Sequence, residues 1–300
     1  MSEPITFDDR VAIVTGAGGG LGKTYALELA RRGARVVVND LGGAVDGTGS
    51  SESAADKVVT EIAEAGGEAV ANYDSVASPE GGESIVQTAL DSFGKVDIVI
   101  NNAGILRDKS FTKMTMDEVQ AVLDVHLKGG FNVSSPAFKV MRENAYGRFV
   151  FTSSASGLFG NFGQANYGAA KAGLVGLTNV LAIEGAKYNI KANAIAPIAK
   201  TRMTEDLPIP DAVAAEHVTP MVVYLCSEAN QYTHEIFTAG GGRYGRVFIG
   251  TNRGWFSGAE RVATAEDVAE HIDDIRDLED YIVPMSNNDE IMILGEMLSS

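Results

Sequence analysis

A tyrosine and a lysine stand four positions apart in the second half of the chain, at Tyr167 and Lys171. In a helix, residues at this spacing share one face, so the lysine ammonium can lie beside the phenol. A phenol has a pKa near 10, and lowering it by two units needs roughly 2.7 kcal/mol. A positive charge about 4 Å away supplies on the order of 4 kcal/mol at an effective dielectric constant of 20. The pair therefore predicts proton transfer to or from a hydroxyl group.

Ser154 adds a second hydroxyl to this pair. It follows a short apolar run and precedes Tyr167 by thirteen residues. Its side chain could donate a hydrogen bond to the reacting oxygen while hydride moves to or from a nicotinamide ring. Each residue also has an ordinary role: tyrosine in packing, lysine on a solvated helix surface, and serine as a helix cap. Together they favour the interconversion of a secondary alcohol and a ketone.

A glycine-rich segment near the N-terminus predicts a dinucleotide site. The sequence TGAGGGLG, Thr15 to Gly22, directly follows an apolar strand pattern and opens a helical one. Glycines let the backbone turn sharply and approach a pyrophosphate, whose charge is met by the helix N-terminus. A glycine turn alone also occurs in structural loops, but the flanking strand and helix favour the binding role. The candidate cofactor contacts here are Gly16, Gly20, Leu21 and Gly22.

Polar residues follow three further strands and complete the expected cofactor site. Asp40 ends the second strand, where a carboxylate can bind both ribose hydroxyls and repel a 2′-phosphate, which favours NAD over NADP. A strand-end aspartate is also a common turn former. Asp74 follows the third strand and could face the adenine, and Asn102 lies in the run that ends the fourth strand. Tyr167 and Lys171 are also expected to contact the cofactor.

Short apolar runs alternate with helical patterns, which predicts an α/β fold with a doubly wound parallel sheet of the Rossmann type. The predicted strands are Val11–Thr15, Arg35–Asn39, Glu68–Asn72, Val96–Asn101, Arg148–Thr152 and Lys191–Ala196. The predicted helices are Leu21–Arg32, Ala54–Ala65, Pro79–Phe93, Met116–Val140 and Tyr167–Lys187. A later helix, Val218–Cys226, and a strand region, Glu235–Phe248, complete the pattern.

We expect one domain over residues 1–250 and an acidic C-terminal extension over 251–300. Within the extension, Ala265–Tyr281 has the pattern of one acidic helix. The segment Gly42–Ser53 is rich in glycine and serine and is predicted to be a mobile loop. Thr201–Asp211 contains two prolines and could be either a lid over the site or an ordinary surface loop.

The formal net charge of −16 argues against nucleic-acid binding. From residue 251 onward, twelve acidic residues stand against three arginines, so −9 of that charge lies in the extension. Cys226 is the only cysteine, and the four histidines lack metal-ligand spacing, so we assign no metal and no disulfide. No uncharged apolar stretch of 18 residues indicates a membrane span, and neither a secretory signal nor a peroxisomal address is evident, so we expect a cytoplasmic protein.

The order of TGAGGGLG, NNAG, Ser154 and the Tyr167/Lys171 pair resembles the short-chain dehydrogenase/reductase family, over about residues 7–247. Within it, VVVNDLGG, AADKVV, NNAGILRDKSF and TSSASGLFGNFGQANY resemble the (3R)-hydroxyacyl-CoA dehydrogenase region of the peroxisomal multifunctional enzymes of type 2 and their bacterial stand-alone relatives. This resemblance implies NAD-linked oxidation of a (3R)-hydroxyacyl-CoA, in fatty-acid or steroid side-chain β-oxidation. It also implies a homodimer or homotetramer packed through the helices near Met116 and Tyr167.

Two positions depart from the wider family. His126 stands where the family usually has an asparagine that organises a proton relay, so the resemblance leaves a relay or a packing role for His126. Pro197 is followed by Ile198 where the family commonly has glycine. By the same resemblance, Thr201 and nearby backbone should meet the nicotinamide amide.

Two other functions compete with this prediction. A 3-oxoacyl-carrier-protein reductase, or another carbonyl reductase, would prefer NADPH and a basic surface, which Asp40 and the net charge disfavour. A non-catalytic NAD-binding sensor is disfavoured by the complete set of Ser154, Tyr167 and Lys171. Four basic residues could meet the phosphates of a CoA thioester or merely be solvated: Lys109, Lys113, Lys200 and Arg202.

Overall fold

An eight-stranded sheet forms the centre of the first of two compact units, Met1–Arg246. The structure is a computed structural model that describes residues 4–51, 53–205 and 210–299. The strand order is β3-β2-β1-β4-β5-β6-β7-β8, and the pairs from β3 through β7 are parallel. The strands are β1 Val11–Thr15, β2 Arg35–Asn39, β3 Glu68–Asn72, β4 Ile98–Asn101, β5 Gly147–Thr152, β6 Ile190–Pro197, β7 Glu235–Gly240 and β8 Arg243–Val247. Because chain order reverses between β1 and β4, the loops at their carboxyl ends diverge and leave a crevice there.

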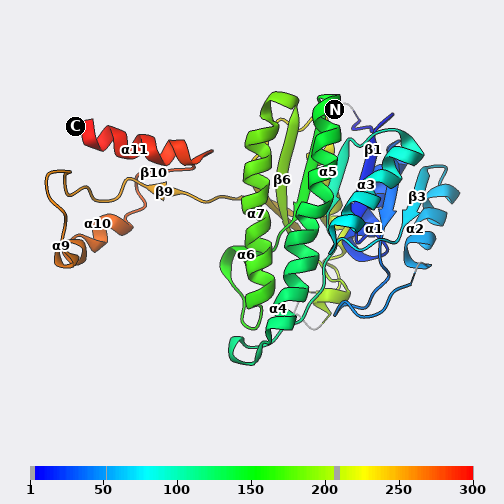
Figure 1. The fold of residues 1–300 in the computed structure, drawn as a ribbon, viewed down its shortest axis with the longest axis horizontal. Coiled ribbons are helices and arrows are strands. Elements are labelled where there is room, and N and C mark those ends of the chain that lie inside the picture. Colours follow the sequence, from blue (N-terminus) through cyan, green and yellow to red (C-terminus); the bar gives the residue numbers. More distant parts are fainter. Residues whose placement is uncertain (1–3, 52, 206–209, 300) are drawn as a thin grey trace. The chain divides into compact units, whose positions relative to one another are not determined.

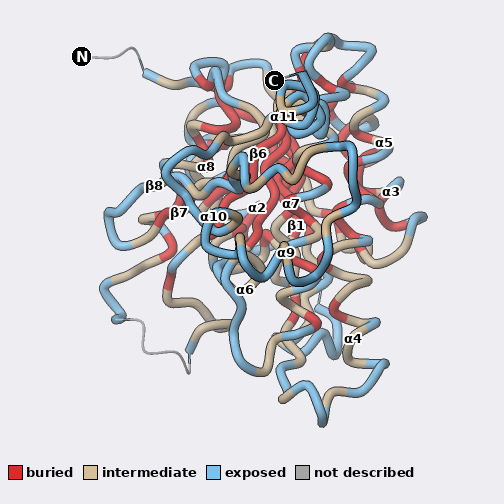
Figure 2. Tube along the Cα trace, turned by 90° about the vertical axis from the view of Figure 1, so that its left-hand side faces the viewer, coloured by how far each residue is buried: buried red, intermediate tan, exposed pale blue. Residues whose placement is uncertain are grey.

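Helices cover both faces of this sheet (Figure 1). One layer contains α1 Gly20–Arg31, α2 Ser53–Glu64 and α8 Thr219–Cys226, and the other contains α3 Pro79–Phe93, α5 Gly129–Asn144 and α7 Ala165–Gly185. Successive residues of β1 alternate between the layers: Ala12 and Val14 pack on the first, and Val11 and Ile13 on the second. Burial is therefore concentrated along the strands (Figure 2), as expected for a parallel sheet covered on both sides.

The predicted fold class is confirmed, and β1, β2, β3 and α3 have their predicted bounds. The predicted single helix Met116–Val140 is interrupted: α4 Met116–Leu123 leads into a π-helical turn, η2 Asp124–Lys128, before α5. Such turns widen a helix locally and re-aim its side chains, frequently at functional sites. The remaining short elements are η1 Phe111–Lys113, α6 Ala155–Phe159, η3 Ala186–Tyr188, η4 Arg202–Thr204 and η5 Ala215–His217.

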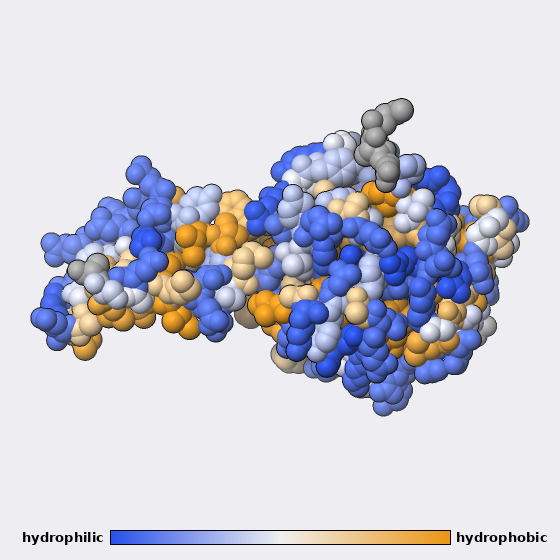
Figure 3. Space-filling model, turned by 90° about the horizontal axis from the view of Figure 1, so that it is seen from above, coloured by the Kyte–Doolittle hydropathy of each residue, from blue (hydrophilic) through white to orange (hydrophobic). Residues whose placement is uncertain are grey.

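The second unit, Val247–Ser300, begins four residues before the predicted extension, which starts at residue 251. It contains an antiparallel pair, β9 Thr251–Asn252 with β10 Tyr281–Ile282, and the helices α9 Ala265–Glu270, α10 Ile272–Arg276 and α11 Asn287–Ser299. The predicted single helix Ala265–Tyr281 is wrong, because the chain leaves helical geometry at His271 and Asp277. Like-charged neighbours at helical spacing weaken a helix, and this stretch is strongly acidic. Hydrophilic side chains prevail on the face of this unit in Figure 3.

Among the described residues, every helix is too short or too polar to span a membrane. Cys226 is a free thiol with no exposed surface.

Candidate active site

The glycine turn after β1 has the geometry that close approach by a ligand requires. Gly16 and Gly20 have φ of 64° and 52°, where a side chain would be strained. A Cβ at Gly22 would lie 2.3 Å from the carbonyl oxygen of Gly16, so this position must stay bare. The Asn102 amide braces the turn by donating to the carbonyls of Thr15 and Gly16 at 3.0 and 3.1 Å. The first N–H groups of α1 are thereby presented to an anion such as a pyrophosphate.

Asp40 joins the glycine turn to the loop that follows β2. Its Oδ2 accepts a hydrogen bond from the Gly18 N–H and its Oδ1 accepts one from the Gly42 N–H, each at 2.7 Å. A carboxylate has about four acceptor positions, so two remain for the hydroxyls of a ribose. The residue can therefore both anchor the backbone and bind a nucleoside.

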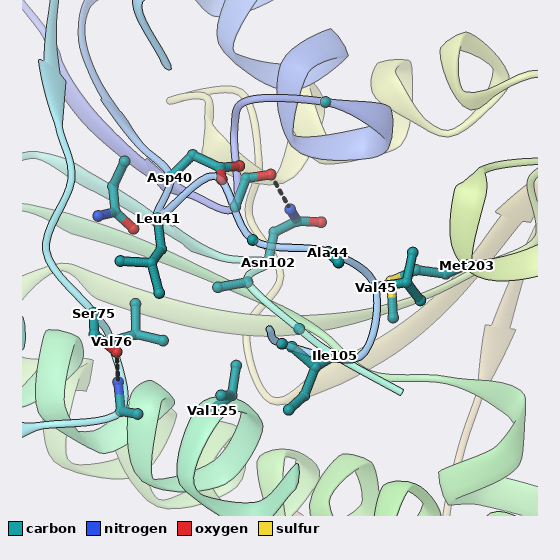
Figure 4. A pocket seen from close by; sticks show the side chains of 18 of the residues that line it. Asp40, Leu41, Ala44, Val45, Ser75, Val76, Asn102, Ile105, Val125 and Met203 are labelled. Atoms are coloured by element: carbon teal, nitrogen blue, oxygen red, sulfur yellow. Dashed lines mark hydrogen bonds between the residues drawn. The ribbon is translucent and has the colours of Figure 1, made fainter. Parts of the chain in front are cut away.

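A cavity of about 410 Å³ opens beside this turn and beneath the loop after β2 (Figure 4). Its volume lies in the range of small-molecule sites, about 300–1,000 Å³. Seven of the predicted cofactor contacts line it: Gly16, Gly20, Leu21, Asp40, Asp74, Asn102 and Thr201. Three predicted cofactor contacts, Gly22, Tyr167 and Lys171, do not line the cavity, and Gly22 instead lets α1 pack against the turn. The prediction did not include several apolar lining residues: Leu41, Ala44, Val45, Val76, Ile105, Val125 and Met203.

The segment predicted as a mobile loop is folded against the chain that leaves β4. The Leu106 N–H donates to the Val45 carbonyl at 2.9 Å, and Arg107 Nε donates to the Asp46 carbonyl at 3.0 Å. The loop thereby supplies one wall of the cavity. The side chains of this segment do not indicate these two contacts, because the groups of the loop that accept the hydrogen bonds are backbone carbonyls.

Asp74 and Thr201 stand at different parts of the cavity wall. Asp74 Oδ2 accepts hydrogen bonds from Ser84 Oγ and Asn72 Nδ2 at 2.7 and 2.9 Å. Thr201 faces Gly20, since a Cβ at that glycine would come within 3.9 Å of it. The predicted lid lies only partly within the described residues, because 206–209 and the Arg202 side chain are outside them.

Ser154, Tyr167 and Lys171 meet where β5 ends and α7 begins. Ser154 is the N-cap of α6, its Oγ accepts a hydrogen bond from the Ser156 N–H at 3.2 Å, and its hydroxyl lies close enough to the Tyr167 phenol to lower the pKa of that group. Lys171 is 2% exposed, its Nζ donates to the Thr152 carbonyl, and it lies 5.5 Å from the centroid of the Tyr167 ring. The structure therefore brings all three predicted catalytic residues together.

The electrostatics of this group correct one expectation. Burial raises the pKa of Tyr167 to about 12, against the smaller lowering effect of the Ser154 hydrogen bond. Burial also lowers the pKa of Lys171 to about 7. The sequence argument considered the lysine charge but not the desolvation of both groups, which opposes it. A further positive charge near the phenol is needed to make it a base at neutral pH.

His126 lies in the π-helical turn, beside the tyrosine. Its Nε2 is 3.0 Å from the Ile105 nitrogen and 2.8 Å from the Ile105 oxygen, while its buried Nδ1 has no hydrogen-bond partner among the described residues. The ring meets that of Tyr167 edge to face, with centroids 5.1 Å apart. Burial, and secondarily Lys171, hold the pKa of His126 well below its usual value, so the ring is neutral. A neutral ring suits either role suggested for it, relay or packing.

A polar pair at the start of α7 is not among the residues predicted from the sequence. Asp108 and Gln164 are hydrogen-bonded there at 2.6 Å. Both belong to stretches, NNAGILRDKSF and TSSASGLFGNFGQANY, that were read only for their family resemblance. Lys109, considered for CoA phosphates, forms an ion pair with Glu118 at 2.6 Å.

Comparison with known proteins agrees with this geometry. The family model described as short chain dehydrogenase matches residues 10–210. A short-chain type dehydrogenase/reductase of Mycobacterium tuberculosis is 55% identical over 90% of this chain and 95% of its own length.

Two larger proteins are also similar. The peroxisomal hydratase-dehydrogenase-epimerase of Saccharomyces cerevisiae is 55% identical over 81% of this chain, and the match covers only 27% of that protein. The solved structure of full-length peroxisomal multifunctional enzyme type 2 from Drosophila melanogaster matches with a TM-score of 0.83 and 36% identity, over 98% of this chain and 50% of that one. With its glycine turn and its serine, tyrosine and lysine in place, the chain belongs to the short-chain dehydrogenase family and is an oxidoreductase.

Proposed function

We propose that this enzyme oxidises a (3R)-3-hydroxyacyl-CoA, with a fatty or steroidal acyl group, to the 3-ketoacyl-CoA with NAD⁺. The observation that carries the proposal is the grouping of Ser154, Tyr167 and Lys171 at the same sheet edge as the cavity lined by Asp40. Parallel α/β sheets bind their ligands at this edge.

In the proposed reaction the Ser154 hydroxyl donates a hydrogen bond to the substrate oxygen and holds it beside Tyr167. Tyr167, as its phenolate, takes the hydroxyl proton as the carbon–hydrogen bond breaks and a ketone forms. The chemistry that NAD⁺ would supply when bound is a hydride acceptor and a positive charge that favours the phenolate form of Tyr167. The Thr152 carbonyl accepts a hydrogen bond from Lys171 Nζ and so holds the lysine near the phenol. The His126 ring packs edge to face against the Tyr167 ring and so holds it in place.

Asp40 supports NAD as the coenzyme rather than NADP. Its two free acceptor positions suit ribose hydroxyls, and its negative charge would repel a 2′-phosphate. The same repulsion disfavours the alternative of an NADPH-dependent 3-oxoacyl-carrier-protein reductase, and the net charge of −16 disfavours an acidic carrier as partner.

The thioester class is supported by the sequence resemblance and by the chemistry in the yeast relative's name. A hydratase adds water to a double bond and yields an alcohol, which is what a dehydrogenase consumes. A sensor without activity would have no use for a complete set of Ser154, Tyr167 and Lys171.

Initial rates with NAD⁺ and NADP⁺, on a panel of (3R)- and (3S)-hydroxyacyl-CoA thioesters, test the proposal. We expect turnover of a 3R thioester and at least about a 100-fold higher kcat/KM with NAD⁺, since a buried charge conflict costs several kcal/mol. Preference for NADP⁺, or for the 3S series, would contradict it. Tight NADH binding without turnover of any thioester would favour another alcohol as substrate.

We also propose that two or four copies associate through α5 and α7. Phe131, Val180 and Ile183 are about half exposed on these helices, and a second copy packed there would cover this apolar surface. Light scattering should give a dimer or tetramer mass. Ile183→Asp should lower it, whereas Thr60→Asp, on exposed α2 surface, should not. A monomer in the unmodified protein would contradict this arrangement.

A further inference from the structure

The loop after β2 reaches across the cofactor cavity to the chain that leaves β4. We propose that residues 41–51, here called the strap, form a lid that opens to admit and release NADH, and that Arg107 is the positioning residue that holds the lid closed. The inference rests on the proposed coenzyme site, because the strap lines the same cavity as Gly16, Asp40 and Asp74.

The two ends of the strap are fastened at its base. The Gly42 N–H donates to Asp40 Oδ1 at 2.7 Å, and the Ser51 N–H donates to the Leu41 carbonyl at 3.0 Å. Gly42 has a φ of 72°, and a Cβ there would lie 1.9 Å from the Ser51 carbonyl oxygen, so the two arms lie against each other. A loop closed at its base can move as one flap, with its tip swinging furthest.

The tip of the strap is a small folded turn. The Ala44 N–H donates to the Thr48 carbonyl at 2.8 Å, and the Gly47 N–H donates to the Ala44 carbonyl at 3.0 Å. Asp46 Oδ1 accepts hydrogen bonds from the Thr48 N–H at 3.0 Å and from the Thr48 hydroxyl at 2.7 Å. Because these bonds are internal to the tip, the tip can leave the cavity without unfolding.

Two hydrogen bonds, here called the latch, join the tip to the chain beyond β4. The Leu106 N–H donates to the Val45 carbonyl at 2.9 Å, and Arg107 Nε donates to the Asp46 carbonyl at 3.0 Å. A charged donor makes a stronger hydrogen bond than a neutral amide does. Arg107 therefore supplies the stronger latch bond, and it is also the one that a side-chain substitution can remove.

The closed strap forms part of the cavity itself. Leu41, Ala44 and Val45 of the strap line the cavity together with Ile105 and Val125 (Figure 4). The Ile105 side chain packs against the tip, since a Cβ added at Gly47 would lie 3.0 Å from its Cδ1. A dinucleotide in this cavity is therefore covered by the strap, and its exchange requires the latch to break.

A lid differs from an ordinary binding contact in its kinetic effect. The latch bonds lie within the chain, so they oppose opening both before NADH enters and before it leaves. Weakening the latch therefore raises the association and dissociation rate constants by the same factor and leaves Kd in place. Loss of a direct contact with NADH would raise the dissociation rate constant alone.

Stopped-flow fluorescence of NADH gives both rate constants for the unmodified protein and for Arg107→Met, which keeps the side-chain stem but has no donor. Both should rise about tenfold, as expected for a lost hydrogen bond from a charged group, while Kd changes by less than about twofold. Salt at about 0.5 M screens the lost charge from the coenzyme phosphates. Arg31→Met, on exposed α1 surface, is the matched control and should leave both rate constants in place.

Asp46 tests the latch from the side of the strap. Asp46→Ala removes the acceptor of both Thr48 hydrogen bonds, so the turn that presents the Asp46 carbonyl to Arg107 should loosen. Both rate constants should then rise, as in Arg107→Met. Asp46→Asn keeps an oxygen that can accept from the Thr48 N–H, so it should return both rate constants toward those of the unmodified protein.

Hydrogen exchange at the Leu106 amide follows strap opening without any coenzyme, since this N–H is bonded to the Val45 carbonyl. It should exchange about tenfold faster in Arg107→Met than in the unmodified protein. Unchanged exchange in Arg107→Met, unchanged rate constants, or a rise in the dissociation rate constant alone would overturn the inference. Failure of the unmodified protein to bind NADH would instead contradict the proposed coenzyme site.

Discussion

Tyr167→Phe should lower kcat for alcohol oxidation by about 1,000-fold, because positioned acid–base groups contribute typically 10²–10⁴-fold. Phenylalanine keeps the ring that meets His126 edge to face, so the packing beside α4 should survive. Only the phenol oxygen and its interaction with the Ser154 hydroxyl are lost. Steady-state rates and NADH binding measured on the same preparation give the comparison, with binding expected to change by less than about threefold.

Tyr232→Phe is the matched control, since it removes a phenol oxygen from a side chain that is 54% exposed on the surface. It should behave as the unmodified enzyme does. If Tyr167→Phe retained more than a tenth of the activity, proton transfer would have to be assigned to another group.

Gly22→Ala should lower both stability and cofactor affinity. The new Cβ would lie 2.3 Å from the Gly16 carbonyl oxygen and 2.6 Å from Asn102 Nδ2, so the turn must open. Overpacking of this kind costs about 1–3 kcal/mol, which corresponds to a fall in Tm of about 3–10 °C for a domain of this size. NADH affinity should weaken at least about tenfold, since the turn that opens is the one that presents the α1 N–H groups.

Gly19→Ala separates crowding from the mere loss of a glycine. A Cβ at Gly19 meets nothing within 4 Å, and the residue has the extended φ of −168°. Thermal unfolding of Gly19→Ala should match the unmodified protein within about 2 °C. Equal destabilisation by both substitutions would mean that the contact between α1 and the turn is not what Gly22 protects.

The sequence was sufficient for the strands at the centre of the sheet because they are rich in apolar residues, whereas the predicted strand region Glu235–Phe248 contains two strands, β7 and β8. Val11–Thr15 and Arg35–Asn39 are buried on both faces, so neither strand could belong to a solvent-facing sheet. The interruption at Asp124–Lys128 could not be predicted in this way, since a π-helical turn changes the hydrogen-bond partner and leaves the apolar pattern almost unaltered.

The parts of the site that could be predicted are those where a local requirement selects the residue type. Gly16 and Gly20 adopt a conformation that favours glycine, and the Tyr167/Lys171 spacing places both side chains on one helical face. The pKa of the tyrosine was not predictable, because desolvation depends on everything packed around it. The hydrogen bond between Gln164 and Asp108 joins residues 56 positions apart, so no local sequence pattern indicates it.

The two backbone hydrogen bonds at Asp40 have a consequence for engineering and for evolution. An NADP-preferring variant must remove the carboxylate, yet the same two oxygens tie Gly18 to Gly42 and so shape the cavity wall. A neutral residue that admits the extra phosphate would release at least one of these two amides, because it cannot offer two carboxylate oxygens. A single substitution at Asp40 is therefore not expected to change the coenzyme preference during evolution. A compensating substitution in the loop after β2 has to precede the change at Asp40 or occur together with it.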